Sequence, residues 1–408
     1  MKDLGVIMVI PGTTWQIPLI KRIKEKGYRA LVVHPTKDGD ALPYADEIEY
    51  ADILNNEACL NIAKKYQIKA IMSDECDVAT PTLAYVSTHM GIPTQTEAMA
   101  ALYTDKALMR DFSKAHGFPY PAYHVCQTLE DALSFFRSLG KKMVMKPIDA
   151  NSSRGVFTIH NEEELKTLFP DSIKYSHHRK AVICEQFIPG AEFSIDGILT
   201  PQGYYNMVIS EKTQFSYNKN LDEFLYFSYH NPKYNYDRLR EINKQFVEAS
   251  DLPFGFTHAE YRFDDGEFYL LEIGARGGGA EISSHIVPAM TGVDNYSVLI
   301  DMFVGKPIEH PVKFDEGYEK RCAVLRFFDT IEEGGVVKEI KGLDFLECNK
   351  DVLNYKINFK VGDRICRPTD GGNRIGFYVA CSKDAETLDK LMKEVDENVK
   401  IKYESSRI

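Results

Sequence analysis

Two glutamates, Glu260 and Glu272, lie in a stretch of sequence that is otherwise rich in apolar residues and predicts a β-hairpin. Apolar residues dominate positions 268–273, and Asp264-Asp265-Gly266 supplies the turn. A carboxylate inside so apolar a strand is unfavourable unless a cation or hydrogen bonds compensate it. Two converging acids suit a hard divalent ion, above all Mg²⁺, bridging to phosphate oxygens. Arg276, which follows the second arm, would bind a planar anion through two parallel hydrogen bonds.

The turn decides whether the two acids lie on the same face of the hairpin. A two-residue Asp265-Gly266 turn in a regular ladder would place Glu260 and Glu272 on opposite faces. A three-residue loop over 264–266, with Gly266 in the left-handed conformation, would make them diagonal neighbours on one face, roughly 7–8 Å apart. The metal site therefore requires the three-residue loop. The alternative is two solvent-facing acids beside an ordinary hairpin.

Composition sets the class of protein. The chain has 408 residues, which predicts two to four domains, and its 44% hydrophobic and 27% charged residues are ordinary globular values. A net charge of −11 argues against a nucleic-acid surface. No apolar run approaches the roughly 20 residues of a membrane span, and the start predicts a first strand instead of a signal peptide. We therefore expect a cytoplasmic protein whose eight scattered cysteines are free thiols.

Strand and helix patterns alternate over the first hundred residues. Strands are predicted at 6–10, 29–34 and 70–73, and helices at 16–26, 57–66 and 81–90. This rhythm predicts a parallel sheet wound with helices, an α/β arrangement. The turn after the first strand has no G-x-G-x-x-G, so a dinucleotide site is unsupported, and the sequence contains no G-x-x-x-x-G-K-[ST] of a P-loop.

After residue 104 the pattern changes. Lys106 opens a helix, and Lys146 closes an apolar strand that is followed by the polar loop Asp149-Ala-Asn-Ser-Ser-Arg-Gly155. Small residues with hydroxyl and backbone N–H groups between two strands can enclose phosphate oxygens, although most such loops are only turns. Further on, a strand reaches Glu185, and a second acid, Glu192, follows seven residues later.

The order of these features resembles the ATP-grasp superfamily over the whole chain. Residues 1–100 are similar to the domain that precedes the ATP-grasp domain, including Tyr44-Ala45-Asp46 and Ile92-Pro93, and residues 315–408 resemble the C-terminal domain of carboxylate–amine ligases, with Val361-Gly362-Asp363 and Arg374-Ile375-Gly376-Phe377. The most similar branch is that of the L-amino-acid ligases, or dipeptide synthetases. The resemblance implies a Rossmann-like domain at 1–103, an α+β ATP-grasp domain at 104–309 whose part 104–180 includes a small lid, and a small α+β domain at 310–408.

The resemblance also implies roles for individual residues. ATP would be bound by two phosphate-binding lysines, the polar loop, the connection that follows Glu185 and an acid on the ribose: Lys106, Lys146, Ser152, Ser153, Gly155, Glu185, Gln186, Phe187, Ile188 and Glu192. Glu260 and Glu272 would bind Mg²⁺, for which Mn²⁺ is an alternative. Arg276 would stabilise the phosphorylated intermediate.

Two features depart from the family pattern. Many members have Asn two residues after the second metal ligand, where this chain has Gly274. Water can complete a magnesium shell, so one or two metal ions are both compatible with the sequence. The phosphate loop also contains less glycine than usual.

Further candidates belong to the substrate end of the site. The resemblance implies that Glu75, Gly278, Ser284 and His285 contact substrate; the alternatives are a solvated loop for Glu75 and a packed or helix-capping histidine for His285. Lys212 is predicted to end a strand, from which its side chain would reach the γ-phosphate. The aromatic stretch 215–229 is either a flap over the substrate or core.

The function implied is ATP-dependent joining of a carboxylate to an amine through an acyl phosphate, with release of ADP and phosphate. Both substrates would be small molecules, an amino acid joined to another amino acid or to a small amine, and a homodimer is left open. Alternatives are a purine-type enzyme that activates formate or carbonate, a biotin-carboxylase relative, and an ATP-binding sensor without catalysis.

Overall fold

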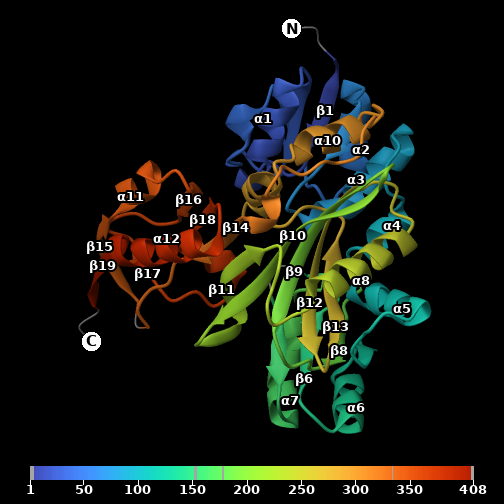
Figure 1. Ribbon diagram of the computed structural model, residues 1–408. Coiled ribbons are helices and arrows are strands. Elements are labelled where there is room, and N and C mark those ends of the chain that lie inside the picture. The colour runs from blue at the N-terminus through green and yellow to red at the C-terminus, as the bar shows by residue number, and fades with distance from the viewer. Residues whose placement is uncertain (1–3, 151–153, 177–178, 333, 406–408) are drawn as a thin grey trace.

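The computed structural model describes residues 4–150, 154–176, 179–332 and 334–405 (Figure 1). These residues form four sheets: a parallel sheet near the N-terminus, a small antiparallel sheet, a long central sheet and a three-stranded sheet near the C-terminus. Helices pack against the first three of these sheets. The mixed α/β architecture expected from the sequence is confirmed. The predicted loop residues Ser152 and Ser153 lie outside the described residues.

The first sheet is parallel, as predicted, with strand order β3-β2-β1-β4. Its strands are β1 (Val6–Val9), β2 (Arg29–His34), β3 (Glu47–Tyr50) and β4 (Ala70–Met72), and its helices are α1 (Ile17–Glu25), α2 (Asn56–Tyr66) and α3 (Thr80–Met90). The apolar residues of β1 and β4 are fully or almost fully buried, because helices cover both faces of such a sheet. The sequence did not predict β3, an edge strand whose residues alternate between half-buried acids and exposed apolar side chains.

The small antiparallel sheet has the order β5-β8-β6-β7. It consists of β5 (Tyr123–Cys126), β6 (Met143–Pro147), β7 (Phe157–Ile159) and β8 (Val182–Gln186), with α6 (Leu129–Leu139) and α7 (Glu162–Ile173) packed on it. This sheet and its helices form the lower end of the molecule in Figure 1. The strand predicted around Lys146 is β6, an inner strand of this sheet, and Lys146 is its last residue but one.

The central sheet has eight antiparallel strands in the order β13-β12-β9-β10-β11-β14-β18-β16. Their bounds are β9 (Glu192–Thr200), β10 (Gly203–Phe215), β11 (Asn218–Ser228), β12 (Gly255–Asp264), β13 (Glu267–Gly274), β14 (Cys322–Phe327), β16 (Val352–Ile357) and β18 (Gly376–Ser382). Because β11 pairs with β14, one sheet continues across the boundary predicted at residue 309. The boundaries at 103 and 309 stay predictions.

The remaining elements surround this sheet. They are α4 (Glu97–Leu102), α5 (Lys106–His116), α8 (Tyr236–Ala249), α9 (Val287–Thr291), α10 (Asn295–Phe303), α11 (Leu343–Cys348), α12 (Ala385–Asn398), β15 (Gly335–Lys341), β17 (Arg364–Ile365) and β19 (Lys400–Ser405). In Figure 1 the C-terminal elements lie to one side of the central sheet, and the N-terminal sheet lies above it. The cysteines are free thiols, as predicted. Within the described ranges, no helix combines the length and apolar character needed to cross a membrane.

The β12–β13 hairpin places the two acids on one face, as the metal site requires, but they lie directly opposite each other and not diagonally as predicted. Its loop has two residues, Asp265 (φ 46°) and Gly266 (φ 85°), because Asp264 pairs with Glu267; the predicted three-residue loop is wrong. A β-bulge lies further along, where the register shifts between Glu260 and Tyr261. One extra residue in β13 moves Glu272 directly opposite Glu260, so both acids share a face of the sheet.

Candidate active site

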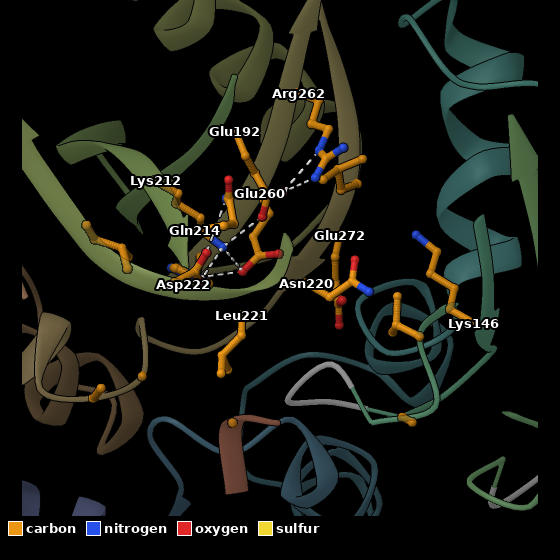
Figure 2. Close-up of a pocket in the computed structure, with 18 of the residues that line it drawn as sticks. Lys146, Glu192, Lys212, Gln214, Asn220, Leu221, Asp222, Glu260, Arg262 and Glu272 are labelled. Carbon is orange, nitrogen blue, oxygen red and sulfur yellow. Dashed lines mark hydrogen bonds and ion pairs between the residues drawn. The ribbon is translucent and has the colours of Figure 1, made fainter. Parts of the chain in front are cut away.

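A cavity of about 570 Å³ lies between the small sheet and the central sheet, and segments from the N- and C-terminal regions complete its wall. Of the predicted site residues, Lys106, Lys146, Glu185, Gln186, Phe187, Ile188, Glu192, Glu260, Glu272, Arg276 and Glu75 line it. In Figure 2, Lys146 projects from the small-sheet side, and Glu260 and Glu272 come from the central sheet. The fold thus gathers residues separated by up to two hundred positions around one space.

The face of the central sheet toward the cavity carries charged residues in rows, because alternate residues of a strand point the same way. One row runs across three strands: Arg262 of β12, Glu192 of β9 and Lys212 of β10 are register partners. Arg262 donates from Nε (3.0 Å) and Nη2 (2.9 Å) to Glu192 Oε2, and Lys212 Nζ lies 3.2 Å from Glu192 Oε1. Both carboxylate oxygens of the predicted ribose-binding acid are therefore held in place.

The neighbouring row contains the two predicted metal ligands. Glu260 lies opposite Glu272, and each has a side chain about 30% exposed toward the cavity. Lys212 Nζ lies 2.6 Å from Glu260 Oε1, and Lys106 Nζ lies 3.1 Å from Glu272 Oε1. Burial would raise the pKa of Glu260, but Lys212 and His258 outweigh that effect and hold it well below its usual value. Glu260 is therefore a carboxylate at neutral pH.

These two carboxylates fit a magnesium ion that takes its other ligands from elsewhere. Among the residues that the structure describes, no group of three or more His, Cys, Asp or Glu side chains is placed to hold a metal ion. Mg²⁺ is commonly bound by one or two carboxylates together with substrate phosphates and waters, and Mn²⁺ accepts the same oxygen ligands. The donor set is thus that of a metal bound together with a phosphate substrate.

A third row of charged residues connects β12 to the glycines at 277–279. His258, two residues before Glu260, has Nδ1 2.9 Å from Asp196 Oδ2, and Asp196 Oδ1 accepts a hydrogen bond from the Gly278 backbone N–H at 2.8 Å. Burial lowers the pKa of His258, but Asp196 raises it more, to about 9. A protonated His258 adds a fixed positive charge beside Glu260. Gly278, predicted to contact substrate, lies against this pair and outside the cavity wall formed by the described residues.

On the opposite side, Lys146 belongs to a buried group of charges. Its Nζ lies 2.6 Å from Glu185 Oε2, and Arg110 Nε donates to Glu185 Oε1 at 2.5 Å. Burial lowers the pKa of Lys146, whereas Arg110 and Lys146 lower that of Glu185 despite its burial. The ion pair fixes the direction in which Lys146 enters the cavity.

The segment after Glu185 continues the cavity wall. The Phe187 ring has Lys142 Nζ 3.9 Å and the Arg262 guanidinium carbon 5.3 Å from its centroid. Ile188 is buried, and its carbonyl oxygen accepts a hydrogen bond from Arg262 Nη1 at 3.0 Å. Gly155 does not reach this wall: it adopts φ +71°, and a Cβ there would meet Tyr175 at 2.8 Å.

Arg276 lines the cavity and is paired with an acid that the sequence did not single out. Its Nε and Nη2 each donate to an oxygen of Asp77 at 2.8 Å, and its Nη1 donates to the Gly277 carbonyl oxygen. Each terminal nitrogen of a guanidinium carries two N–H donors, so Nη1 and Nη2 each keep one N–H that these bonds do not use. Asp77 also explains Gly274, since a Cβ at that position would lie 2.6 Å from Asp77 Oδ1.

A group of buried acids lies beside Arg276, at the other end of the cavity from the small sheet. Asp74 accepts hydrogen bonds from the Gly277 N–H, Ser283 and Tyr296. Burial, reinforced by Asp74, raises the pKa of Glu75 well above its usual value, and burial raises that of Glu281 to about 7. Glu75 is the member that lines the cavity.

Two predicted substrate residues lie behind this group. His285 is about 29% exposed, and its Nδ1 lies 2.8 Å from Ser284 Oγ and 3.5 Å from Glu281 Oε2. Burial lowers the pKa of His285. Neither His285 nor Ser284 belongs to the cavity wall that the described residues form. Their contact with substrate stays a prediction.

Sequence reasoning missed several charged residues of the site, among them Asp77, Arg110, Asp196, His258 and Arg262. Patterns in the sequence were available for each. His258 and Arg262 flank Glu260 at the two-residue spacing of one strand face, and Asp196 is related to Glu192 in the same way. Arg110 follows Lys106 by one helical turn, and Asp77 follows Glu75 in the loop after β4.

Comparison with known proteins agrees with this geometry. The family model described as "ATP-grasp domain" matches residues 139–284, and the model described as "L-amino acid ligase C-terminal domain 2" matches residues 327–404. A D-alanine–D-alanine ligase of Thermotoga maritima is 30% identical over 175 residues, which are 41% of this chain and 56% of that ligase. Dapdiamide A synthase of Enterobacter agglomerans is 28% identical over 178 residues, which are 42% of this chain and 40% of that synthase. The chain thus matches about half the length of these relatives.

The fold as a whole is also known. The crystal structure of L-amino acid ligase from Bacillus licheniformis superposes with a TM-score of 0.84, covering 99% of this chain and 100% of that one at 19% identity. At this identity the likeness concerns the fold. Two parts of the chain thus match known families: residues 139–284 match the ATP-grasp domain, and residues 327–404 match a C-terminal domain of L-amino acid ligases.

Proposed function

We propose that the protein is an ATP- and Mg²⁺-dependent ligase that activates a carboxylate as an acyl phosphate and transfers the acyl group to an amine. ADP and phosphate are the other products. The observation that supports this most strongly is the cavity itself, where two lysines, two facing carboxylates and an arginine meet: Lys106, Lys146, Glu260, Glu272 and Arg276. Cations and metal-binding acids around one space suit the transfer of a phosphoryl group.

ATP is proposed to lie between β6 and the segment from Gln186 to Glu192, with its phosphates toward Glu260 and Glu272. Phe187 and Ile188 supply apolar surface for the adenine, and Glu192 accepts hydrogen bonds from the ribose hydroxyls. Lys106 and Lys146 neutralise phosphate charge. All of these residues line the same cavity, which supports the assignment.

The reaction proceeds in two displacements. An oxygen of the substrate carboxylate attacks the γ-phosphorus of ATP and ADP leaves; the amine nitrogen then attacks the acyl carbon, loses a proton, and phosphate leaves. A bound Mg²⁺ would stabilise negative charge on the phosphate oxygens. The outer edge of Arg276 would hold the carboxylate and then the oxyanion, where charge develops. Bound side by side, the reactants need no covalent enzyme nucleophile.

Amino acids are the proposed substrates on both sides of the bond. The names of the relatives support this, since they include a D-alanine–D-alanine ligase and an L-amino acid ligase. The buried acid Glu75, which lines the cavity near Arg276, also suits a substrate that carries an ammonium group, because that charge would compensate a buried carboxylate. Glu75 is proposed to contact the amine.

The test is phosphate release from ATP with a panel of amino acids, supplied singly and in pairs, together with formate and bicarbonate. The proposal expects ADP and phosphate to form in proportion to a dipeptide or amide, and the variant Glu272→Gln to be folded and at least a hundredfold slower. Turnover only with formate or bicarbonate would identify a purine-type or carboxylase reaction. ATP binding without turnover on any substrate would indicate a sensor.

A further inference from the structure

Helix α5 presents two cations, one helical turn apart, to consecutive residues of β13. Lys106 Nζ lies 3.1 Å from the carboxylate of Glu272, and Arg110 Nη2 donates to the backbone carbonyl oxygen of Leu271 at 2.6 Å. Residues four apart on a helix share one face, so a single helix face addresses both the side chain of a predicted metal ligand and the backbone before it.

Leu271 is the extra residue of the β-bulge. Glu260 pairs with Glu272 and Tyr261 pairs with Leu270, so Leu271 has no register partner in β12. An extra residue of this kind is left out of the ladder, and a buried backbone group without a partner is unfavourable. The guanidinium of Arg110 supplies that partner. This contact holds the bulge that brings the two acids opposite each other.

Arg110 also contacts the other side of the cavity. The same guanidinium donates from Nε to Glu185, which pairs with Lys146. Arg110 is completely buried. Lys146 alone would neutralise Glu185, so charge balance does not explain a second buried cation, which is costly to desolvate. The position of Arg110 is explained by its two contacts, with Glu185 on one side and with the Leu271 carbonyl on the other.

We propose that Arg110 is a positioning residue of the active site: it fixes the Leu271 bulge, and through it the facing of Glu260 and Glu272, while it orients Lys146 through Glu185. Arg110 is not part of the cavity wall that the described residues form, so it acts through its neighbours. The proposal rests on the proposed function insofar as the aligned acids bind a metal with nucleotide. The bulge itself is testable without any ligand.

The test compares Arg110→Lys and Arg110→Met with a matched control, Arg137→Lys. Arg137 makes a two-bond pair with Glu162 from an exposed helix position, so its replacement changes the same chemical group away from the cavity. The Arg110→Lys variant retains the buried charge and is expected to fold. Its single ammonium group cannot bond both Glu185 and Leu271, as the guanidinium of Arg110 does. The methionine variant is measured if it folds.

The first readout is amide hydrogen exchange of a peptide covering residues 267–274, without nucleotide or metal. Exchange is expected to be at least tenfold faster in Arg110→Lys and unchanged in Arg137→Lys. The second readout is Mn²⁺ binding in the presence of ADP, followed by electron paramagnetic resonance. We expect about tenfold weaker Mn²⁺ binding in Arg110→Lys, and a fall in kcat that exceeds any rise in the KM for ATP.

A chain lacking Leu271 separates the two routes by which Arg110 acts. Deletion of Leu271 leaves Glu260 opposite Glu272, so we expect Mn²⁺ affinity to stay within threefold of that of the unaltered protein. When Arg110→Lys is added to the chain without Leu271, we expect little further change in Mn²⁺ affinity. If Arg110→Lys weakens Mn²⁺ binding as much in the chain without Leu271 as in the full chain, the role of the bulge is overturned. Unchanged exchange and unchanged Mn²⁺ binding in Arg110→Lys would overturn the whole proposal. If the unaltered protein binds no Mn²⁺ with ADP, the proposed function fails, and the exchange result alone decides the bulge.

Discussion

Arg276 and Asp77 form a two-bond ion pair that joins the loop after β4 to the segment after β13, 199 positions away in the sequence. Each side chain is only about 15% exposed. Burial would raise the pKa of Asp77, but Arg276 outweighs it and holds the pKa below its usual value. The pair fixes the guanidinium beside the cavity and connects the N-terminal sheet to the proposed chemistry.

Removing one member of this pair should destabilise the protein strongly. Asp77→Ala leaves the guanidinium of Arg276 largely buried without its partner, so we expect the free energy of unfolding to fall by about 3 kcal/mol. In the double variant with Arg276→Ala the loss should be clearly smaller than the sum of the two single losses. Urea denaturation of the four proteins measures this. Additive losses would show that the pair has no coupling.

Gly274 should not accept a side chain, although many family members carry one there. Since a Cβ at 274 would lie 2.6 Å from Asp77 Oδ1, Gly274→Ala must displace the carboxylate, and we expect a loss of about 1–3 kcal/mol. Gly279→Ala is the matched control, because no atom lies within 4 Å of a Cβ there. Thermal unfolding compares the two. Equal stability of both variants would contradict the close approach of Asp77.

Glu192 should affect ATP binding more than turnover. Its two oxygens are held by Arg262 and Lys212 on the proposed ribose side of the cavity, and ribose contacts are similar in the ground and transition states. Glu192→Gln is expected to raise the KM for ATP about tenfold and to change kcat less than threefold. Glu267→Gln, an exposed acid of the same sheet, is the control. A selective loss of kcat would count against the ribose role.

The stability of the protein should depend on pH through Glu281. Burial raises its pKa from 4.5 to about 7, so the folded state retains a proton that the unfolded state has lost, and stability falls as pH rises through that window. Glu281→Gln should match the unaltered protein near pH 4 and be more stable at pH 8, by about 3 kcal/mol. Urea denaturation across this range tests it. Parallel pH curves for the two proteins would contradict the assignment.

Local pattern predicted much of this molecule. The apolar runs of β1, β2 and β4, separated by helical patterns, predicted the parallel sheet. The acids of the hairpin suggested a metal site, whose shared face was expected from a loop length that the structure does not have. The edge strand β3 was missed because its alternating acids are compatible with a loop. The site residues Lys106, Lys146, Glu192 and Glu260 came from their order along the chain.

What the sequence did not predict depends on contacts between distant residues. The bulge at Leu271 could not be predicted from the residues of the hairpin alone. The residue that binds its carbonyl oxygen is Arg110, 161 positions earlier in the sequence. The partner of Arg276 was missed for the same reason. A turn of Asp-Asp-Gly is compatible with two loop lengths, and only tertiary contacts select between them.

Trapping of the activated carboxylate tests the central claim most directly. With ATP, Mg²⁺, its carboxylate substrate and hydroxylamine, the protein should form a hydroxamate together with equal amounts of ADP and phosphate. Arg276→Lys should still bind ATP but form at least a hundredfold less hydroxamate, because lysine cannot present two parallel donors. Release of AMP and pyrophosphate, or the absence of hydroxamate with every carboxylate tried, would contradict the acyl-phosphate account.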